Sequence, residues 1–257
     1  MRSDPCMDKV YIGDSRALIT ICYPRIEPDC IRRRLSALEA HGVQYICPGG
    51  RSILPALHGG EPLRILGKGH LSVVVKALLD NEIVALKIRR TDSKKPSLIE
   101  EAHLQEKASI AGVAPRPYVY EKDFIVMEYV EGDPLIHYFE KGMFTAKHLR
   151  ELLEASWILD SIGILHRELT RPHYHVYFKD FSFKALILDY DSAILGTCGS
   201  LNKVASWIIR NLIGFRTKNT EGLVKLLSRY RKERCSKEIY NEIRSIILTS
   251  VVGPEDD

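Results

Sequence analysis

The order of strand-like and helix-like apolar patterns limits the fold of this chain more than any other feature. Between residues 63 and 130, short apolar runs rich in Val and Ile are separated by turns such as Asp80-Asn81, a pattern typical of an antiparallel meander. From Gly132 onward, apolar residues recur three and four positions apart, as they do on one face of a helix. A block of strands followed by a block of helices predicts an α+β fold.

Individual elements can be assigned within these blocks. The first block is expected to hold a helix at 97–112 and strands at 63–67, 72–79, 82–88, 117–121 and 124–130. The second block is expected to hold a hairpin formed by 174–178 and 183–188, and helices at 145–163, 201–215, 221–233 and 236–249.

The first 60 residues predict a further small unit. A buried strand is expected at 17–24, a helix at 27–42 and a second strand at 43–47, which suggests a βαβ-like or wing-like fold. A Gly-Gly-Glu-Pro turn at 59–62 marks its boundary. Packing on the sheet lobe is the expected role of this unit. The predicted domains are therefore 1–60, 61–131 (sheet lobe) and 132–257 (helical lobe).

Composition indicates a soluble globular protein. The 257 residues are 45% apolar and 27% charged, and no apolar run reaches the roughly 18 residues of a membrane span. The N-terminal stretch carries Asp4 and Asp8 and lacks the apolar segment of a secretory signal, so a cytoplasmic location is expected. The six cysteines form no Cys-x-x-Cys pair and are widely scattered. We expect buried small side chains rather than a zinc site or a disulfide framework.

Basic residues gather in three places, although the net charge of +4 is mild. These clusters lie at 32–34, 89–95 and 229–237. Solvated helix faces are the first interpretation of the clusters. A surface for nucleic acid, the ribosome or an acidic partner is the second.

Two segments of the strand-rich block carry phosphate-binding signals. The string GKGHLSVV places Gly67 and Gly69 between two strands, with Ser72 at the third glycine position of a G-x-G-x-x-G-x-V pattern. Glycines let the backbone approach phosphates closely, although a turn alone also explains them. Lys87 ends the apolar strand VALK, and an ammonium on a buried face needs an anion or a carboxylate. A solvent-exposed strand end is the alternative for Lys87.

The helix that follows offers a partner for Lys87. Ser97 and Glu100 have the spacing of a capping box, which turns Glu100 back toward the start of the helix. Glu101 instead lies on the apolar face of the helix, toward the sheet. Glu101 is therefore the preferred partner, and Glu106 is the alternative.

Two acidic residues of the helical block each follow an apolar segment. Glu168 lies in the string HRELTRPHYHVYF, and Asp189 begins the turn DYDSA. The predicted hairpin between them would bring the two carboxylates side by side, where one orients a hydroxyl nucleophile and the other holds magnesium on phosphates. At the lobe junction, in MEYV, the Glu128 carbonyl and the Val130 amide can pair with an adenine edge.

In this order the motifs resemble the signature of protein kinases over about residues 63–215. The strings LHRELTRPHYHV and ILDYDSA look most like small atypical kinases of the RIO and lipopolysaccharide-kinase type, and closest to predicted archaeal serine/threonine kinases. The resemblance implies a bilobal kinase fold that binds ATP with Mg²⁺ or Mn²⁺. It implies that Gly67 and Gly69 cover the ATP phosphates, and that Lys87 contacts the phosphates and pairs with Glu101.

The resemblance also assigns the second group of residues. Glu128 and Val130 fall at the adenine-binding hinge, Asp189 at the metal-binding turn and Glu168 at the position of the catalytic base. Because that base is ordinarily Asp, the carboxylate here stands one methylene further from the backbone.

Two further departures concern the metal and the substrate. Where the family has a metal-binding Asn, this chain has His173, and His175 follows; counting back from the next strand favours His175. Imidazole suits Mn²⁺ better than Mg²⁺, and a hydrogen bond from His175 to Glu168 or to a phosphate is the alternative. The stretch between Asp189 and Leu201 is too short for an activation segment.

The sequence therefore predicts an ATP-dependent phosphotransferase that acts on Ser or Thr hydroxyls of proteins, its own included. The alternatives are a pseudokinase that binds nucleotide as a scaffold, which Glu168 and His173 favour, and a small-molecule kinase of the aminoglycoside type. A nucleotide and a protein substrate are the expected partners.

Overall fold

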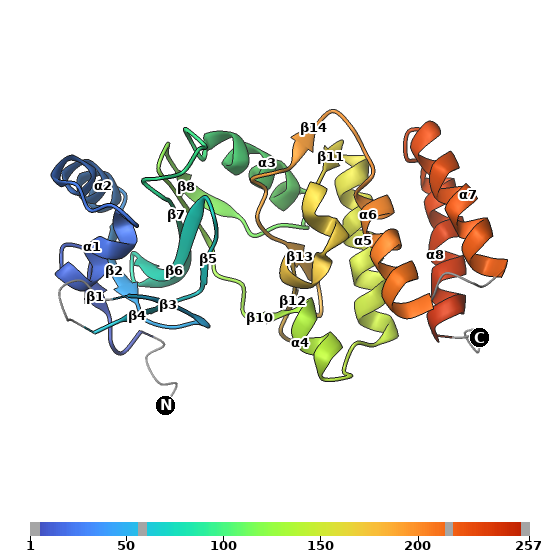
Figure 1. Ribbon diagram of the computed structural model, residues 1–257, viewed down its shortest axis with the longest axis horizontal. Coiled ribbons are helices and arrows are strands. Elements are labelled where there is room, and N and C mark those ends of the chain that lie inside the picture. Colours follow the sequence, from blue (N-terminus) through green and yellow to red (C-terminus); the bar gives the residue numbers. More distant parts are fainter. Residues whose placement is uncertain (1–5, 56–60, 214–217, 253–257) are drawn as a thin grey trace. The chain divides into compact units, whose positions relative to one another are not determined.

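The computed structural model describes residues 6–55, 61–213 and 218–252 (Figure 1). The chain divides into two compact units, Met1–Ala102 with Arg116–Tyr129 and His103–Pro115 with Val130–Asp257. The first unit is built on an antiparallel sheet and the second is mainly helical. These units confirm the predicted α+β, kinase-like bilobal fold. The expected turn at 59–62 lies partly outside the described residues.

The sheet unit has the strand order β1-β2-β6-β7-β9-β8, with β5 also paired to β6. Its strands are β1 (Val10–Tyr11), β2 (Val43–Cys47), β3 (Ser52–Leu54), β4 (Leu63–Ile65), β5 (Gly67–Lys68), β6 (Ser72–Leu79), β7 (Glu82–Arg89), β8 (Pro117–Tyr120) and β9 (Phe124–Glu128). Its helices are α1 (Ser15–Ile21) and α2 (Pro28–Ala40), and the division between the units falls within α3 (Ile99–Ile110). The predicted strands and the helix at 97–112 are present, with small differences at their ends.

The N-terminal segment contributes to this same sheet. Strand β2 pairs with β6, and β1 pairs with β2, so the sheet extends into the first 60 residues. The strand expected at 17–24 is wrong, because this segment forms helix α1. A short apolar run does not distinguish a strand from a buried helix. Here Ala17, Thr20 and Ile21 are buried, with the three- and four-residue spacing of a helix face.

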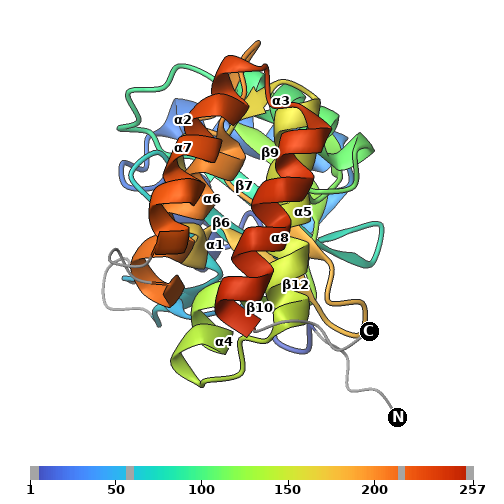
Figure 2. The same ribbon diagram turned by 90° about the vertical axis from the view of Figure 1, so that its right-hand side faces the viewer.

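The helical unit packs its elements around one large apolar core. Its helices are α4 (Leu135–Glu140), α5 (Ala146–Ser161), η1 (Arg167–Thr170), η2 (Pro172–Tyr174), α6 (Ser200–Ile208), the π-helix η3 (Ile209–Ile213), α7 (Lys218–Lys232) and α8 (Lys237–Val252). Its strands are β10 (Gly132–Pro134), β11 (Ile164–Leu165), β12 (Val176–Lys179), β13 (Ala185–Ile187) and β14 (Ile194–Leu195). Figure 2 looks onto α5 to α8, which pack against one another.

The predicted hairpin is present as the antiparallel strands β12 and β13, and β10 adds a third strand beside β12. Gly132 makes this third pairing possible. A Cβ at Gly132 would lie 2.0 Å from the Phe178 carbonyl oxygen, which no side chain tolerates. The hairpin positions the candidate site described below.

The cysteines correct one expectation. All six are paired, as Cys6–Cys47, Cys22–Cys30 and Cys198–Cys235. A long separation in sequence does not exclude a disulfide, because folding places distant cysteines in contact. Five of the six are also buried, as expected of small apolar side chains.

No helix among the described residues is long and apolar enough to cross a membrane.

Candidate functional site

Lys87 and Glu101 form a buried ion pair within the sheet unit. Lys87 lies on the central strand β7 and is 4% exposed, and Glu101, in the first turn of α3, is 1% exposed. The Lys87 ammonium donates a hydrogen bond to the Glu101 carboxylate, and the Lys95 ammonium lies 3.9 Å from the other carboxylate oxygen. The structure therefore places Glu101, the preferred partner, in direct contact with Lys87.

Breaking this pair on one side is expected to destabilise the protein strongly. Lys87→Met would leave the Glu101 carboxylate buried without its main counter-charge, at a cost of about 3–5 kcal/mol in the free energy of unfolding. The double variant Lys87→Met/Glu101→Met removes both charges and should recover most of that loss. Urea unfolding of the wild type, both single variants and the double variant measures the coupling. Single variants that lose less than about 1 kcal/mol would show that water screens the pair.

The glycine-rich segment forms a tight hairpin between β5 and β6. The Gly69 amide donates to the Ser72 carbonyl over 2.9 Å, and the Arg90 guanidinium donates to the Gly69 carbonyl over 2.9 Å. Neither Gly67 nor Gly69 has a positive φ, and a Cβ at Gly67 would meet no atom within 4 Å. The fold therefore does not require Gly67, and the open space beside its backbone suits a ligand that approaches closely.

The two residues expected to meet the adenine, Glu128 and Val130, lie where the chain passes from one unit to the other. Glu128 ends β9, and its backbone amide donates to the Arg116 carbonyl over 2.8 Å. Val130 begins the second unit and is buried.

The second group of candidate residues converges in the helical unit. Glu168 lies on η1, His175 follows η2 and Asp189 follows β13. Each offers a potential metal-ligand atom, and these atoms all lie within 4.8 Å of one another. The His175 Nε2 lies 3.7 Å from a Glu168 carboxylate oxygen. Two carboxylates and one imidazole are a donor set that fits a divalent cation, and the nitrogen favours Mn²⁺ over Mg²⁺.

The β12–β13 hairpin brings these residues together. Val176 pairs with Ile187 across the hairpin, and the Leu188 amide donates to the His175 carbonyl over 2.8 Å. This register places His175 directly beside the start of the DYD turn. Asp189 itself adopts a left-handed backbone with φ of 69°. Asp tolerates this conformation better than most residues, because its short side chain bonds locally.

His173, the other histidine considered for this role, lies elsewhere. Its ring packs against Tyr174 and Trp207, with centroid distances of 4.6 and 6.3 Å. The described residues therefore place His175 with the two carboxylates, and His173 in aromatic contacts.

His166 is a site residue that the sequence analysis did not assign. It is fully buried, and its Nε2 donates to the Asp189 carbonyl over 2.8 Å and contacts the Leu188 carbonyl at 3.2 Å. Burial and the nearby His175 lower the pKa of His166 to about 4, so the ring is neutral at physiological pH. His166 therefore positions the backbone of Asp189. In the sequence, the only indication that His166 is buried is its position directly after the apolar run 162–165.

The structure thus brings together Lys87 with Glu101, and Glu168 with His175 and Asp189, each group within one unit. No family model matches the chain. Calcium/calmodulin-dependent protein kinase type 1 of Macrobrachium nipponense is 28% identical in an alignment of 178 residues, which covers 61% of this chain. The alignment covers 52% of that kinase, so the chain spans about half the length of this curated relative.

The distant similarity and the fold agree on the class of protein. Both support a distant relationship to protein kinases.

Proposed function

We propose that this protein transfers the γ-phosphoryl group of ATP to Ser or Thr hydroxyls of proteins, its own chain included. The convergence of Glu168, His175 and Asp189 carries the proposal, because phosphoryl transfer requires a metal and a hydroxyl-orienting group side by side. The strings around Glu168 and Asp189 support a place among the small atypical kinases of the RIO and lipopolysaccharide-kinase type, close to archaeal examples.

Each residue has a role in this chemistry. Asp189 and His175 would hold Mn²⁺ or Mg²⁺, which neutralises charge on the phosphates. Lys87, fixed by Glu101, would contact the same phosphates, and Gly67 and Gly69 would cover them. Glu128 and Val130 would meet the adenine through their backbone groups.

Glu168 would orient the acceptor. Its carboxylate accepts the hydrogen bond of the Ser or Thr hydroxyl and takes its proton as the hydroxyl oxygen bonds to the γ-phosphorus. The bond from that phosphorus to the bridging oxygen breaks, and ADP leaves. Positioning and charge neutralisation contribute most of the catalysis in this reaction, so Glu can serve where Asp is usual.

Transfer from γ-labelled ATP to the chain itself and to a mixed protein substrate tests the proposal. We expect Glu168→Gln to lower the rate by about 10²–10⁴-fold, because it removes the proton acceptor. Glu168→Asp withdraws the carboxylate by about one methylene and should lose on the order of 100-fold. A pseudokinase would instead show a thermal shift with ATP and metal but no labelled product in any variant. Labelling of an aminoglycoside but of no protein would favour a small-molecule kinase.

The metal preference provides an independent prediction. Wild type is expected to transfer faster with Mn²⁺ than with Mg²⁺, because His175 offers a nitrogen ligand. His175→Asn restores an oxygen ligand and should reverse the preference by about tenfold. Rates at matched metal concentrations measure this ratio, and His173→Asn is the matched control that should leave it unchanged. An unchanged ratio in His175→Asn would remove His175 from the metal site.

The expected cytoplasmic location remains part of the proposal. Disulfides are uncommon in cytosolic proteins except those of hyperthermophiles, so three cysteine pairs would weigh against an ordinary cytosolic location. Alkylation of thiols in intact cells, followed by mass spectrometry, distinguishes paired from reduced cysteines.

A further inference from the structure

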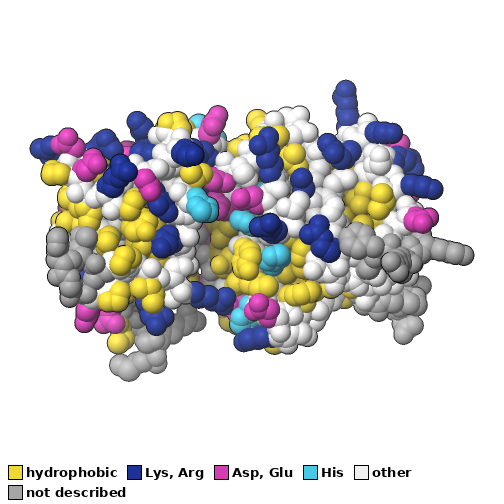
Figure 3. Space-filling view, in the orientation of Figure 1, with side chains coloured by type: hydrophobic (Ala, Val, Ile, Leu, Met, Phe, Trp, Pro, Cys, Tyr) yellow, Lys and Arg dark blue, Asp and Glu magenta, His cyan; other side chains and the backbone are white. Residues whose placement is uncertain are grey.

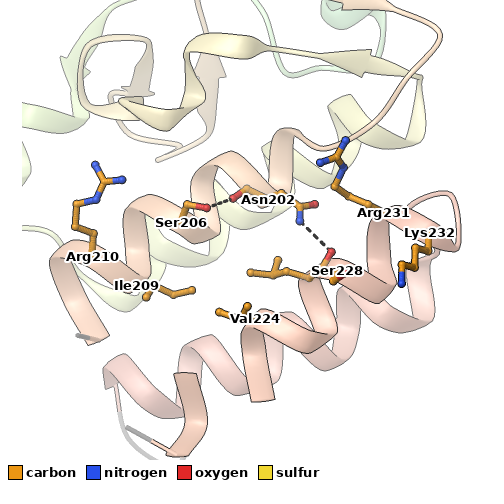
Figure 4. Close-up of a pocket in the computed structure, with 9 residues that line it drawn as sticks. Asn202, Ser206, Ile209, Arg210, Val224, Ser228, Arg231 and Lys232 are labelled. Carbon is orange, nitrogen blue, oxygen red and sulfur yellow. Dashed lines mark hydrogen bonds between the residues drawn. The ribbon is translucent and has the colours of Figure 1, made fainter. Parts of the chain in front are cut away.

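A groove with a volume of about 760 Å³ lies between α6 and α7 of the helical unit. Asn202, Ser206 and Arg210 face it from α6 and η3, at four-residue intervals that place them on one side of the helix (Figure 4). The Asn202 side-chain amide donates to the Leu227 carbonyl over 3.0 Å and so links the two helices. None of the residues described as its lining belongs to the candidate kinase site.

The groove is basic. Arg210, Arg231 and Lys232 line it, and none of the described residues of its lining is acidic. None of these three cations forms an ion pair with a described residue. Arg229, on the same helix but outside the groove, pairs with Glu233 at 2.7 Å. Figure 3 shows Lys and Arg side chains gathered over the part of this unit where α6 and α7 lie.

The arrangement of the cations limits the type of ligand. Arg210 lies at one end of the groove, and Arg231 and Lys232 lie at the other (Figure 4). Ile209 and Val224 provide apolar surface between them. A single phosphate would need cations that converge, whereas an extended chain with acidic groups at both ends and an apolar side chain between them matches this layout.

We propose that this groove binds an acidic peptide segment of the protein that the kinase phosphorylates. This proposal rests on the proposed function and adds the class of substrate. The stretch between Asp189 and α6 is short, so a protein acceptor needs support from another surface. Helix α6 offers one, because it packs against η1, which carries Glu168, and its Trp207 contacts His173.

The cystine Cys198–Cys235 prepares the groove for binding. It joins the segment just before α6 to the segment between α7 and α8, and thereby ties together the two helices that form the walls. A groove whose walls are already fixed loses less conformational freedom when a peptide binds.

Fluorescence anisotropy on the full chain tests the proposal. The probe is a short fluorescein-labelled peptide with Leu residues flanked on both sides by Glu and Asp. Arg231→Glu/Lys232→Glu should weaken its binding by about tenfold or more, because two favourable charges become repulsive. The matched control is Lys225→Glu/Arg229→Glu, which makes the same charge change on the same helix outside the groove. At physiological salt this control should stay within about twofold of wild type.

The outcomes separate this proposal from the function on which it rests. The peptide site is overturned if both double variants lose the same amount of peptide affinity, or if the wild type does not bind the peptide even at low salt. Tighter binding of a single-stranded oligonucleotide through the same residues would assign the groove to nucleic acid instead. Asp189→Asn should bind the peptide like wild type, because Asp189 does not line the groove. Peptide binding by the wild type without any labelled product would reject the kinase function and keep the groove. If the protein transfers phosphate but its peptide binding does not depend on the groove residues, the kinase function is kept and the peptide site is rejected.

Discussion

Asp189→Asn is expected to reduce phosphoryl transfer by about 10³-fold or more, because the metal it would hold contributes several kcal/mol to the transition state. The exchange keeps the size of the side chain and removes one ligand charge. Asn also tolerates the left-handed backbone of position 189, where φ is 69°, so the fold should be retained. Initial rates with γ-labelled ATP at saturating Mn²⁺ and Mg²⁺ measure the loss.

The control makes the same chemical change elsewhere in the helical unit. Asp180 lies exposed in the turn between β12 and β13, and Asp180→Asn should leave both the rate and the melting temperature close to wild type. If Asp189→Asn keeps more than about a tenth of the wild-type rate, the convergence of Glu168, His175 and Asp189 does not hold a catalytic metal. The proposed function would then lose its main support.

Short-range spacing was enough to predict much of the sheet unit and of the site. Strands β6 and β7 follow from apolar runs rich in Val and Ile on either side of Asp80-Asn81, and the pairing of Lys87 with Glu101 follows from the apolar face of one helix. His175 was favoured over His173 by counting back from a strand, and the hairpin register places it beside Asp189. In each case the deciding contact depends on one hairpin or one helix.

Features that depend on the packing of distant segments were not predictable in this way. The apolar run that forms α1 has no periodicity long enough to separate helix from strand, and its contact with the rest of the unit decides the outcome. The disulfides Cys6–Cys47 and Cys198–Cys235 join residues 41 and 37 positions apart. The groove between α6 and α7 likewise appears only when two helices lie side by side.

Asp123 provides the second large expected effect, on stability. It lies in the turn between β8 and β9 and is 6% exposed. Its carboxylate contacts Arg89 of β7 at 2.6 Å, and Arg33 and Arg34 of α2 at 2.9 and 3.1 Å. Arg34 is itself buried, and it also donates to the Ile21 carbonyl over 2.6 Å at the end of α1. The Asp123 carboxylate therefore links α2 to the sheet directly, and it links α1 to the sheet through Arg34.

Asp123→Ala is expected to lower the free energy of unfolding by about 3–5 kcal/mol, because Arg34 and Arg89 would remain close together without a counter-charge. Arg33→Ala is the matched control. The Arg33 side chain is 63% exposed, so its loss should cost less than about 1 kcal/mol. Urea unfolding followed by far-UV circular dichroism measures both variants. Both tryptophans, Trp157 and Trp207, belong to the helical unit, so their fluorescence reports separately whether that unit is affected.

The pH dependence of stability tests whether the Asp123 charge causes this loss of unfolding free energy. Burial alone would raise the pKa of Asp123, but the hydrogen bonds and charges of Arg34 and Arg89 outweigh burial and hold the pKa below its usual value. A carboxyl whose pKa is lower in the folded state stabilises the protein above its unfolded pKa of about 3.9, and loses that contribution as the pH falls through the folded value. The difference in unfolding free energy between wild type and Asp123→Asn should therefore be constant from about pH 5 to 8 and shrink at lower pH. A difference that stays the same down to about pH 2 would mean that Asp123 acts through packing, and not through its charge.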